Sequence, residues 1–154
     1  MLAMVRYRAP LLIAIAVACY VGRFALPYII NDQLVTFGRL GNTTVMALLL
    51  KYGADVNGRG IQNLTPLMAA AKAGNLDGVT FLIDHGADVS ANNGSESVLM
   101  YATGSGDANV VRVLLTHRAE VNWHSDFGAS ALQRAKEDHN DYIAYLLLSY
   151  GAQD

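Results

Sequence analysis

The pattern of apolar positions predicts paired helices along most of the chain, and it is clearest between residues 65 and 89. There a short alanine-rich stretch ends at Gly74. Apolar residues then recur at the three- and four-residue spacing of one helical face: Leu76, Val79, Leu82 and Ile83. Thr65 and Pro66 are suited to the start of the first helix, and Gly86 to the left-handed end of the second. The stretch therefore predicts a helix, a tight turn and a second helix with one buried face.

The motif Gly86-Ala87-Asp88-Val89 shows that this unit repeats. Gly53-Ala54-Asp55-Val56 lies 33 residues earlier, Arg118-Ala119-Glu120-Val121 lies 32 residues later, and Gly151-Ala152 follows after a further 33. A fixed period of about 33 residues is typical of a solenoid of stacked units. We therefore predict about four units, at residues 32–61, 62–93, 94–126 and 127–154.

Three units depart from the pattern at single positions. In the first unit Asp32 stands at the capping position of Thr65, so it is predicted to begin the first helix. In the third unit Arg118 replaces the left-handed glycine, which costs roughly 1 kcal/mol and predicts the weakest joint. The fourth unit has His139 in place of the glycine between its helices, and it is more polar, as a C-terminal cap requires.

Residues 1–30 differ from the repeat domain, residues 31–154, and are predicted to form an N-terminal membrane anchor or signal segment. Arg6 and Arg8 precede the apolar run, and residues 11–30 contain a single charged residue. If the segment is retained, a helix over residues 10–30 is long enough to cross a hydrocarbon layer of about 30 Å. The sequence thus predicts contact with a membrane through this segment.

Two alternatives for the leader stay open. Ala16-Val17-Ala18 supplies the small residues that precede a signal cleavage site, and the segment could also be a hydrophobic cap on the first unit. Arg6 and Arg8 are expected to stay in the cytoplasm. We therefore expect the repeat domain on the periplasmic side of a bacterial inner membrane, or exported to the periplasm after cleavage.

Charge and chemistry argue against several function classes. All 13 acidic residues but only 8 of the 11 basic residues follow residue 30, and an acidic body is a poor match for nucleic acid. The single cysteine, Cys19, cannot form an internal disulfide. His85 and His117 should lie about 10 Å apart, too far to share a zinc ion. With no nucleophile elbow or phosphate loop, we predict no enzyme activity, metal, cofactor or small-molecule substrate.

The repeat resembles the ankyrin repeat. Thr65-Pro66-Leu67, Gly74 and Gly86-Ala87-Asp88-Val89 match the family pattern, while Met68 replaces its histidine. The resemblance covers about residues 32–154. It implies an all-α ankyrin-repeat solenoid of helix-turn-helix units with β-turn fingers, here preceded by an N-terminal hydrophobic helix.

The resemblance also implies a binding face built from the fingers and the exposed side of each first helix. By position, the partner-binding candidates on the fingers are Arg59, Ile61, Gln62, Leu64, Asn92, Asn93, Glu96, Trp123, His124, Asp126 and Phe127. The helix positions are Arg39, Lys72, Lys136 and Glu137, with Met68, Tyr101 and Gln133 nearby, and of these Tyr101 and Lys136 are partner-binding candidates. Trp123 and Phe127 stand out because exposed aromatic side chains anchor protein interfaces. The alternative is that one of them packs between fingers.

Two functional hypotheses follow. The first is a non-catalytic protein-binding module at or across a membrane that grips one specific partner, as an immunity or inhibitor protein for a toxin would. The second is an accessory structural subunit of a membrane complex. In that case the leader helix would dock through a small-residue face formed by Ala14, Ala18 and Gly22.

Overall fold

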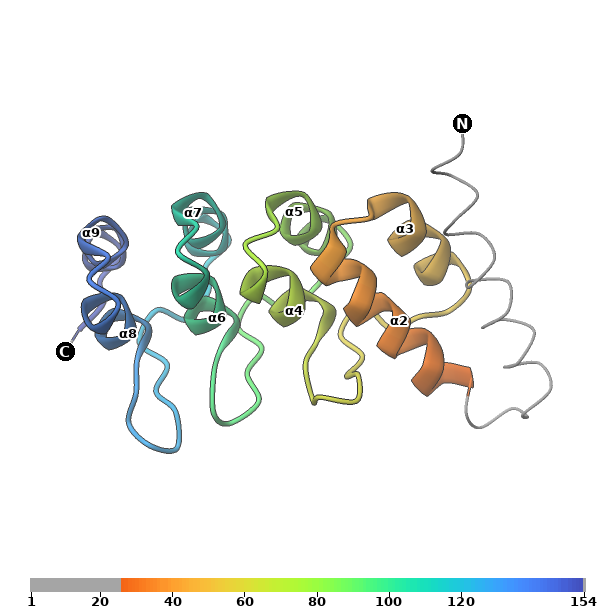
Figure 1. The fold of residues 1–154 in the computed structure, drawn as a ribbon, viewed down its shortest axis with the longest axis horizontal. Coiled ribbons are helices and arrows are strands. Elements are labelled where there is room, and N and C mark those ends of the chain that lie inside the picture. Colours follow the sequence, from red (N-terminus) through yellow and green to blue (C-terminus); the bar gives the residue numbers. More distant parts are fainter. Residues whose placement is uncertain (1–25, 154) are drawn as a thin grey trace.

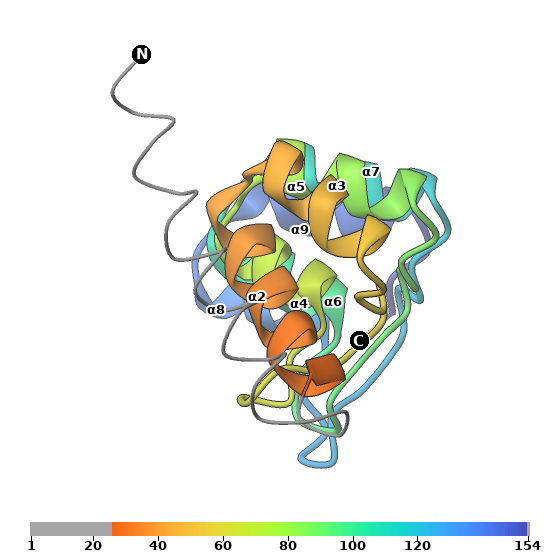
Figure 2. The same cartoon turned by 90° about the vertical axis from the view of Figure 1, so that its right-hand side faces the viewer.

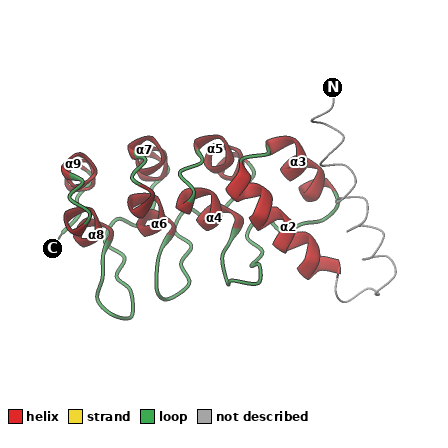
Figure 3. Cartoon of the chain, in the orientation of Figure 1, coloured by secondary structure: helices red, strands yellow, loops and turns green. Residues whose placement is uncertain are grey.

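The computed structural model describes residues 26–153, which form four helix-turn-helix pairs (Figure 1, Figure 3). The pairs are α2 (Leu26–Leu40) with α3 (Thr43–Lys51), α4 (Pro66–Lys72) with α5 (Leu76–Asp84), α6 (Val98–Ser105) with α7 (Ala108–Thr116), and α8 (Ala131–Glu137) with α9 (Asp141–Ser149). Within this part of the chain the only extended pairing consists of two isolated bridges, Asn92 with Ser97 and His124 with Ser130. The predicted all-helical repeat architecture is confirmed.

The helices lie in two rows. The first helix of each pair, α2, α4, α6 and α8, lies in one row, and α3, α5, α7 and α9 lie in the other (Figure 1, Figure 2). Three loops extend from the first row in one direction, and we call them finger one (residues 59–64), finger two (residues 92–96) and finger three (residues 123–129). The fingers and the first row therefore share one side of the molecule.

The turn within each pair follows one rule. A residue with positive φ ends the first helix region, and these residues are Gly41, Gly74, Gly106 and His139. The next residue caps the second helix by accepting a hydrogen bond from a backbone N–H, and these caps are Asn42, Asn75, Asp107 and Asn140. His139 takes the place of this glycine in the fourth pair, as predicted, and its φ of 54° is in the same left-handed region. Thr65 caps α4 as expected, and Ser97 and Ser130 cap α6 and α8 in the same way.

The start of the first unit differs from the prediction. Among the described residues α2 begins at Leu26, so Asp32 lies inside the helix and does not cap it. Instead Asp32 accepts a hydrogen bond from the N–H of Ile61 at 3.0 Å, and Asn31 accepts one from the N–H of Asp55 at 2.9 Å. The first helix thus bonds to the turn and the finger that follow it.

Helix α2 extends to the N-terminal side of residue 31, where the repeat domain was predicted to begin. Ile30 is buried in the core of the repeat domain, and it belongs to α2. The rest of the predicted N-terminal hydrophobic helix, residues 10–25, lies outside the described residues. None of the helices that the structure describes is long and apolar enough to cross a membrane.

One apolar core runs between the two rows through all four pairs. Its largest fully buried side chains come from every pair: Leu34, Met46, Leu67, Met68, Leu82, Leu99, Leu114, Leu132, Ile143 and Leu147. In a solenoid each unit buries its apolar face mainly against its neighbours. The stability of each pair therefore depends on the pair beside it.

Two glycines allow the first pairs to approach closely. A Cβ atom on Gly38 of α2 would lie 2.9 Å from the carbonyl oxygen of Pro66, and one on Gly78 of α5 would lie 2.7 Å from the carbonyl oxygen of Gly38. Both neighbours are backbone atoms, which cannot rotate away. The packing of α2 on α4 and α5 therefore requires glycine at both positions.

The joints between units differ in their hydrogen bonds. Asn57 accepts from the N–H of Asp88 at 2.8 Å and donates to the carbonyl of Gly86 at 3.3 Å. Asn122 makes the same pair of bonds with Gln153 and Gly151, at 2.9 and 3.1 Å. Ser90 stands at the equivalent position, and its hydroxyl only accepts from the N–H of Glu120, at 3.2 Å.

The same joint carries the backbone strain predicted from the sequence. Arg118 adopts a φ of 65°, in the left-handed region that costs a non-glycine residue about 1 kcal/mol. The joint between the second and third units thus combines a missing hydrogen bond with a strained residue. That it is the weakest joint in the stack stays a prediction.

Replacement of Ser90 by asparagine should strengthen this joint. The new amide can donate to the carbonyl of Arg118, as Asn57 and Asn122 do in the neighbouring joints, which should raise the free energy of unfolding by about 0.5–1.5 kcal/mol. Urea unfolding of Ser90→Asn measures this change, with Ser95→Asn on the exposed tip of finger two as the control. An unchanged midpoint for Ser90→Asn would contradict the account.

Replacement of Gly78 by alanine should destabilise the domain. Alanine favours the helical backbone by up to about 1 kcal/mol, but its Cβ meets the carbonyl oxygen of Gly38, so a net loss of about 1–3 kcal/mol is expected. Thermal and urea unfolding measure the loss. Thr80→Ala, at an exposed position of the same helix, should change stability little; a Gly78→Ala protein as stable as this control would exclude the steric constraint.

Candidate functional site

Two finger tips present large apolar side chains to solvent. Ile61 at the tip of finger one is 70% exposed, and Phe127 at the tip of finger three is 90% exposed. Trp123 is half-buried and packs against the core, so the two aromatic residues of finger three lie in different environments. Phe127 is thus exposed, as predicted for an interface aromatic. Trp123 packs inward, as the alternative predicted for one of the two residues.

Backbone contacts tie the fingers to one another. The Arg59 guanidinium donates to the carbonyl of Asn63 in its own finger at 2.9 Å and to the carbonyl of Asn92 in finger two at 2.7 Å. The N–H of Asp126 in finger three donates to the carbonyl of Gly94 at 3.1 Å. Arg59 thus holds fingers one and two together, and the tips of Ile61 and Phe127 stand on a connected row.

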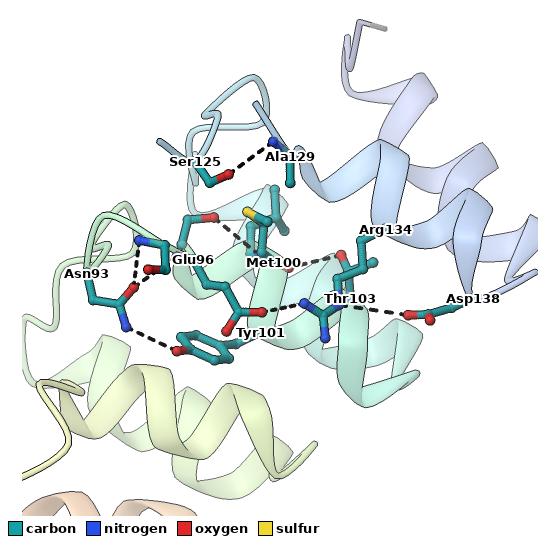
Figure 4. Close-up of polar contacts among 12 residues, drawn as sticks. Asn93, Glu96, Met100, Tyr101, Thr103, Ser125, Ala129, Arg134 and Asp138 are labelled. Atoms are coloured by element: carbon teal, nitrogen blue, oxygen red, sulfur yellow. Dashed lines mark hydrogen bonds and ion pairs between the residues drawn. The ribbon is translucent and has the colours of Figure 1, made fainter. Parts of the chain in front are cut away.

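Finger two is closed by a network of side chains (Figure 4). The side-chain oxygen of Asn93 accepts from the N–H groups of Ser95 and Glu96, at 3.2 and 2.9 Å, and its Nδ2 donates to the Tyr101 hydroxyl at 3.1 Å. Glu96 forms an ion pair with Arg134 of α8, which links the finger to the next unit. Asn93 and Glu96 therefore have partners within the chain.

Two candidates lie under the surface. Leu64 is 6% exposed and belongs to the core, and Tyr101 is 7% exposed. The Lys72 ammonium lies 5.3 Å from the centre of the Tyr101 ring. Burial raises the pKa of the Tyr101 hydroxyl, so this group stays neutral and hydrogen-bonded at physiological pH. Leu64 and Tyr101 therefore lie beneath the surface and are not exposed as a contact residue would be.

A groove of about 410 Å³ lies between α2, α4 and finger one. Its lining consists of Asp32, Val35, Thr36, Arg39, Ile61, Gln62, Leu64, Ala69, Lys72 and Ala73. The small side chains of Ala69 on α4 and of Ala73, the residue that caps its C-terminus, leave the space that larger residues would fill. The groove therefore brings the exposed tip of finger one next to two basic helix residues.

Sequence reasoning identified only part of this groove. It placed Arg39, Ile61, Gln62 and Lys72 on the binding face. The α2 residues Asp32, Val35 and Thr36 were missed, because Asp32 was assigned to a helix cap. Their spacing with Arg39 follows one helical face, which is the signal that could have revealed them.

The family model described as "Ankyrin repeats (3 copies)" matches residues 27–93 and again residues 90–154. The chain belongs to the ankyrin-repeat family. The match begins near the start of α2, which agrees with the early start of the first unit in the structure. Ankyrin repeats are protein-interaction modules, so the family supports a binding function for this chain.

Similar ankyrin proteins include much longer chains. "Ankyrin repeat and KH domain-containing protein mask-1" of Caenorhabditis elegans is 34% identical over 125 residues, which is 79% of this chain and 5% of that protein. "Putative ankyrin repeat protein FPV244" of Fowlpox virus is 34% identical over 79 residues, 51% of this chain and 12% of that protein. "B-cell lymphoma 3 protein homolog" of Mus musculus is 35% identical over 83 residues, 53% of this chain and 18% of that protein. This chain thus spans less than a fifth of each.

The remaining candidates of the ankyrin domain lie at several places. Asn92 is half-buried and shapes finger two, where its side-chain oxygen accepts from the N–H of Gly94 at 3.2 Å. Exposed candidates are Gln62, His124, Asp126 and Lys136. Gln133 donates to Glu137 at 2.9 Å along α8, and Met68 is fully buried. No described group of three His, Cys, Asp or Glu side chains is arranged to hold a metal ion.

A second apolar group lies on α9 in the other row of helices. Its exposed members are Tyr142, Tyr145 and Leu148, and Tyr145 is 70% exposed. The Tyr142 hydroxyl accepts a hydrogen bond from Arg112 of α7. Because α9 lies in the row away from the fingers (Figure 2), it offers a surface of similar exposure for comparison with the finger tips.

Proposed function

We propose that this chain is a non-catalytic binding module that holds a specific protein partner along its fingers and the α2–α4 groove. The observation that carries the proposal is the pair of exposed apolar tips, Ile61 and Phe127, on fingers that are tied to one another. Burial of each side chain in a partner would contribute roughly 1.5–3 kcal/mol. Because hydrogen bonds already connect the fingers, they lose less conformational entropy on binding than unconnected loops would.

The spacing of the tips limits the shape of the partner. Fingers one and three are two units apart, or about 20 Å at the usual distance between packed helices. A partner must therefore offer two apolar contact points at this separation. A folded protein surface or an extended segment of about six residues meets this requirement.

Catalysis is not part of the proposal. Among the described residues that line the groove there is no histidine, cysteine or serine, so a nucleophile paired with a histidine base is not present there. The exposed finger tips Ile61 and Phe127 are large and apolar, and they suit contact with another protein. The site thus favours recognition.

We also propose that the partner is met at or across a membrane, with the domain on the periplasmic side of a bacterial inner membrane or exported after cleavage. This proposal rests on the composition of residues 1–25, which lie outside the described residues. The relatives reported above come from animals and a virus, so a bacterial origin rests on the leader alone. A connected row of fingers with two apolar anchors suits an immunity or inhibitor protein, which must cover one surface of its target.

The mass of the mature protein tests the leader. If the leader is a signal segment cleaved after Ala18, intact mass spectrometry of the soluble fraction should show the loss of about 18 residues. If it is an anchor, the full-length mass should appear in the membrane fraction. A cleaved product would also exclude the alternative function, an accessory subunit docked through the small-residue face of that segment.

Site-specific photo-crosslinking tests the binding face. With a photoreactive phenylalanine analogue at position 61 or 127, we expect both positions to crosslink the same protein in extracts of the source organism. The same analogue at position 145 on α9 is the control, since Tyr145 is as exposed as Ile61. Crosslinks from position 145 and none from 61 or 127 would contradict the proposed face.

Substitution should then weaken capture of that protein. Phe127→Ser with Ile61→Ser should lower its affinity by a factor of ten or more, because interface anchors typically contribute about 2 kcal/mol each. Tyr145→Ser should leave the affinity unchanged. Circular dichroism melts of all variants establish that each remains folded, which is expected because all three positions are exposed.

A further inference from the structure

The α2–α4 groove has a positive end. Arg39 lies in the last turn of α2 and Lys72 in the last turn of α4, and both line the groove. The carboxylate that also lines it, Asp32, already accepts a hydrogen bond from the N–H of Ile61 at 3.0 Å. Asp32 keeps its negative charge, but it lies two helical turns before Arg39 on α2, about 10 Å along the helix axis, so the two cations line the opposite end of the groove.

Neither cation has an acidic partner within the described part of the chain. The two ion pairs found there both involve Arg134, with Glu96 and with Asp138. Lys72 lies over the Tyr101 ring, a contact that stabilises the ammonium without cancelling its charge. The helix C-termini favour positive charge at these positions, but each terminus carries only about half a unit of negative charge. At this end of the groove the two cations therefore outweigh the two helix termini by about one unit of charge.

The described joint between α6 and α8 does not repeat this pair of cations without acidic partners. At that joint the positions equivalent to Arg39 and Lys72 hold Gly104 and Glu137, and the cation nearby, Arg134, forms ion pairs with Glu96 and Asp138. The chain after residue 30 contains more acidic than basic residues. The Arg39 and Lys72 pair is therefore a local basic site on an acidic domain.

The rest of the groove is apolar. Val35, Leu64 and Ala69 line it, and the exposed Ile61 stands at its finger end. Its volume of about 410 Å³ lies within the range of pockets that hold a ligand. An occupant that matches this lining carries a negative group beside a large apolar group, a combination that a protein segment supplies and inorganic phosphate does not.

We propose that this groove binds an extended protein segment that directs an acidic side chain to Arg39 and Lys72 and packs an adjacent large apolar side chain on Val35 and Ala69. The inference rests on the proposed function, because it names the chemistry of the partner at one part of the binding face. It concerns the groove alone and makes no use of Phe127. The two proposals can therefore fail separately.

Titration of the ¹⁵N-labelled domain with two defined peptides tests the inference. The probes are acetyl-Leu-Glu-Leu-Glu-Leu-amide and the same peptide with glutamine in place of glutamate. The glutamate peptide should shift the amide signals of Thr36, Arg39 and Lys72. Its affinity should exceed that of the glutamine peptide about three- to tenfold, as expected for one carboxylate near two partly exposed cations.

Matched variants separate the groove from general charge effects. Arg39→Gln with Lys72→Gln should abolish the preference for glutamate. Lys51→Gln should preserve it, because Lys51 is also an exposed cation in the last turn of a helix, α3, but does not line the groove. Thermal melts of the variants establish that the domain remains folded.

Three results would overturn the inference. These are equal affinities for the two peptides, shifts centred on α9 in place of the groove, and inorganic phosphate that shifts the groove signals as strongly as the glutamate peptide. The last result would mark a general anion site. If crosslinking from positions 61 and 127 still identifies one partner, the proposed function stands while the acidic segment is excluded.

Discussion

The structure depends on the burial of each helix pair against the next, and a single position in the repeat shows this directly. Leu115 of α7, in the third unit, is 4% exposed, whereas Leu148 at the equivalent position of α9, the last described helix, is 51% exposed. At about 25 cal/mol per Å² of buried apolar surface, such differences at several positions make stacking the main source of stability. A pair isolated from its neighbours would expose most of its core, so the stack stabilises its own units.

The close approach of α2 to α4 and α5 links this packing to the candidate site. Gly38 and Gly78 remove the side chains that would keep the backbones apart, and the early start of α2 carries it alongside finger one. There Asn31 and Asp32 bond to the backbone of Asp55 and Ile61. One helix therefore begins the stack, orients a finger and forms a wall of the groove. Changes in α2 should consequently affect stability and binding together.

The candidate site was only partly predictable, for reasons that differ by residue. The repeat gave the position of each finger, and Ile61 and Phe127 are exposed because they fall at finger tips. Leu64 and Tyr101 hold positions on the same face, but their side chains turn inward, and the register alone does not specify that direction. Arg59 and Glu96 were predicted as contact residues from their positions on the fingers, and the structure pairs them with neighbouring units. Contacts between fingers far apart in the sequence leave no periodic signal.

The sequence by itself determined the architecture, because a period of about 33 residues with caps and left-handed turn residues at fixed places is a local property of each unit. It located the turn at His139 and the left-handed residue Arg118 for the same reason. Only the tertiary structure decided where α2 begins, which residues close the groove, and which charges remain without an acidic partner. Those features arise where separate units meet, because they depend on packing and hydrogen bonds between residues that are far apart in the sequence. Only the stacked structure shows that two apolar tips are exposed and that two cations line one groove. The tips are Ile61 and Phe127, and the cations are Arg39 and Lys72.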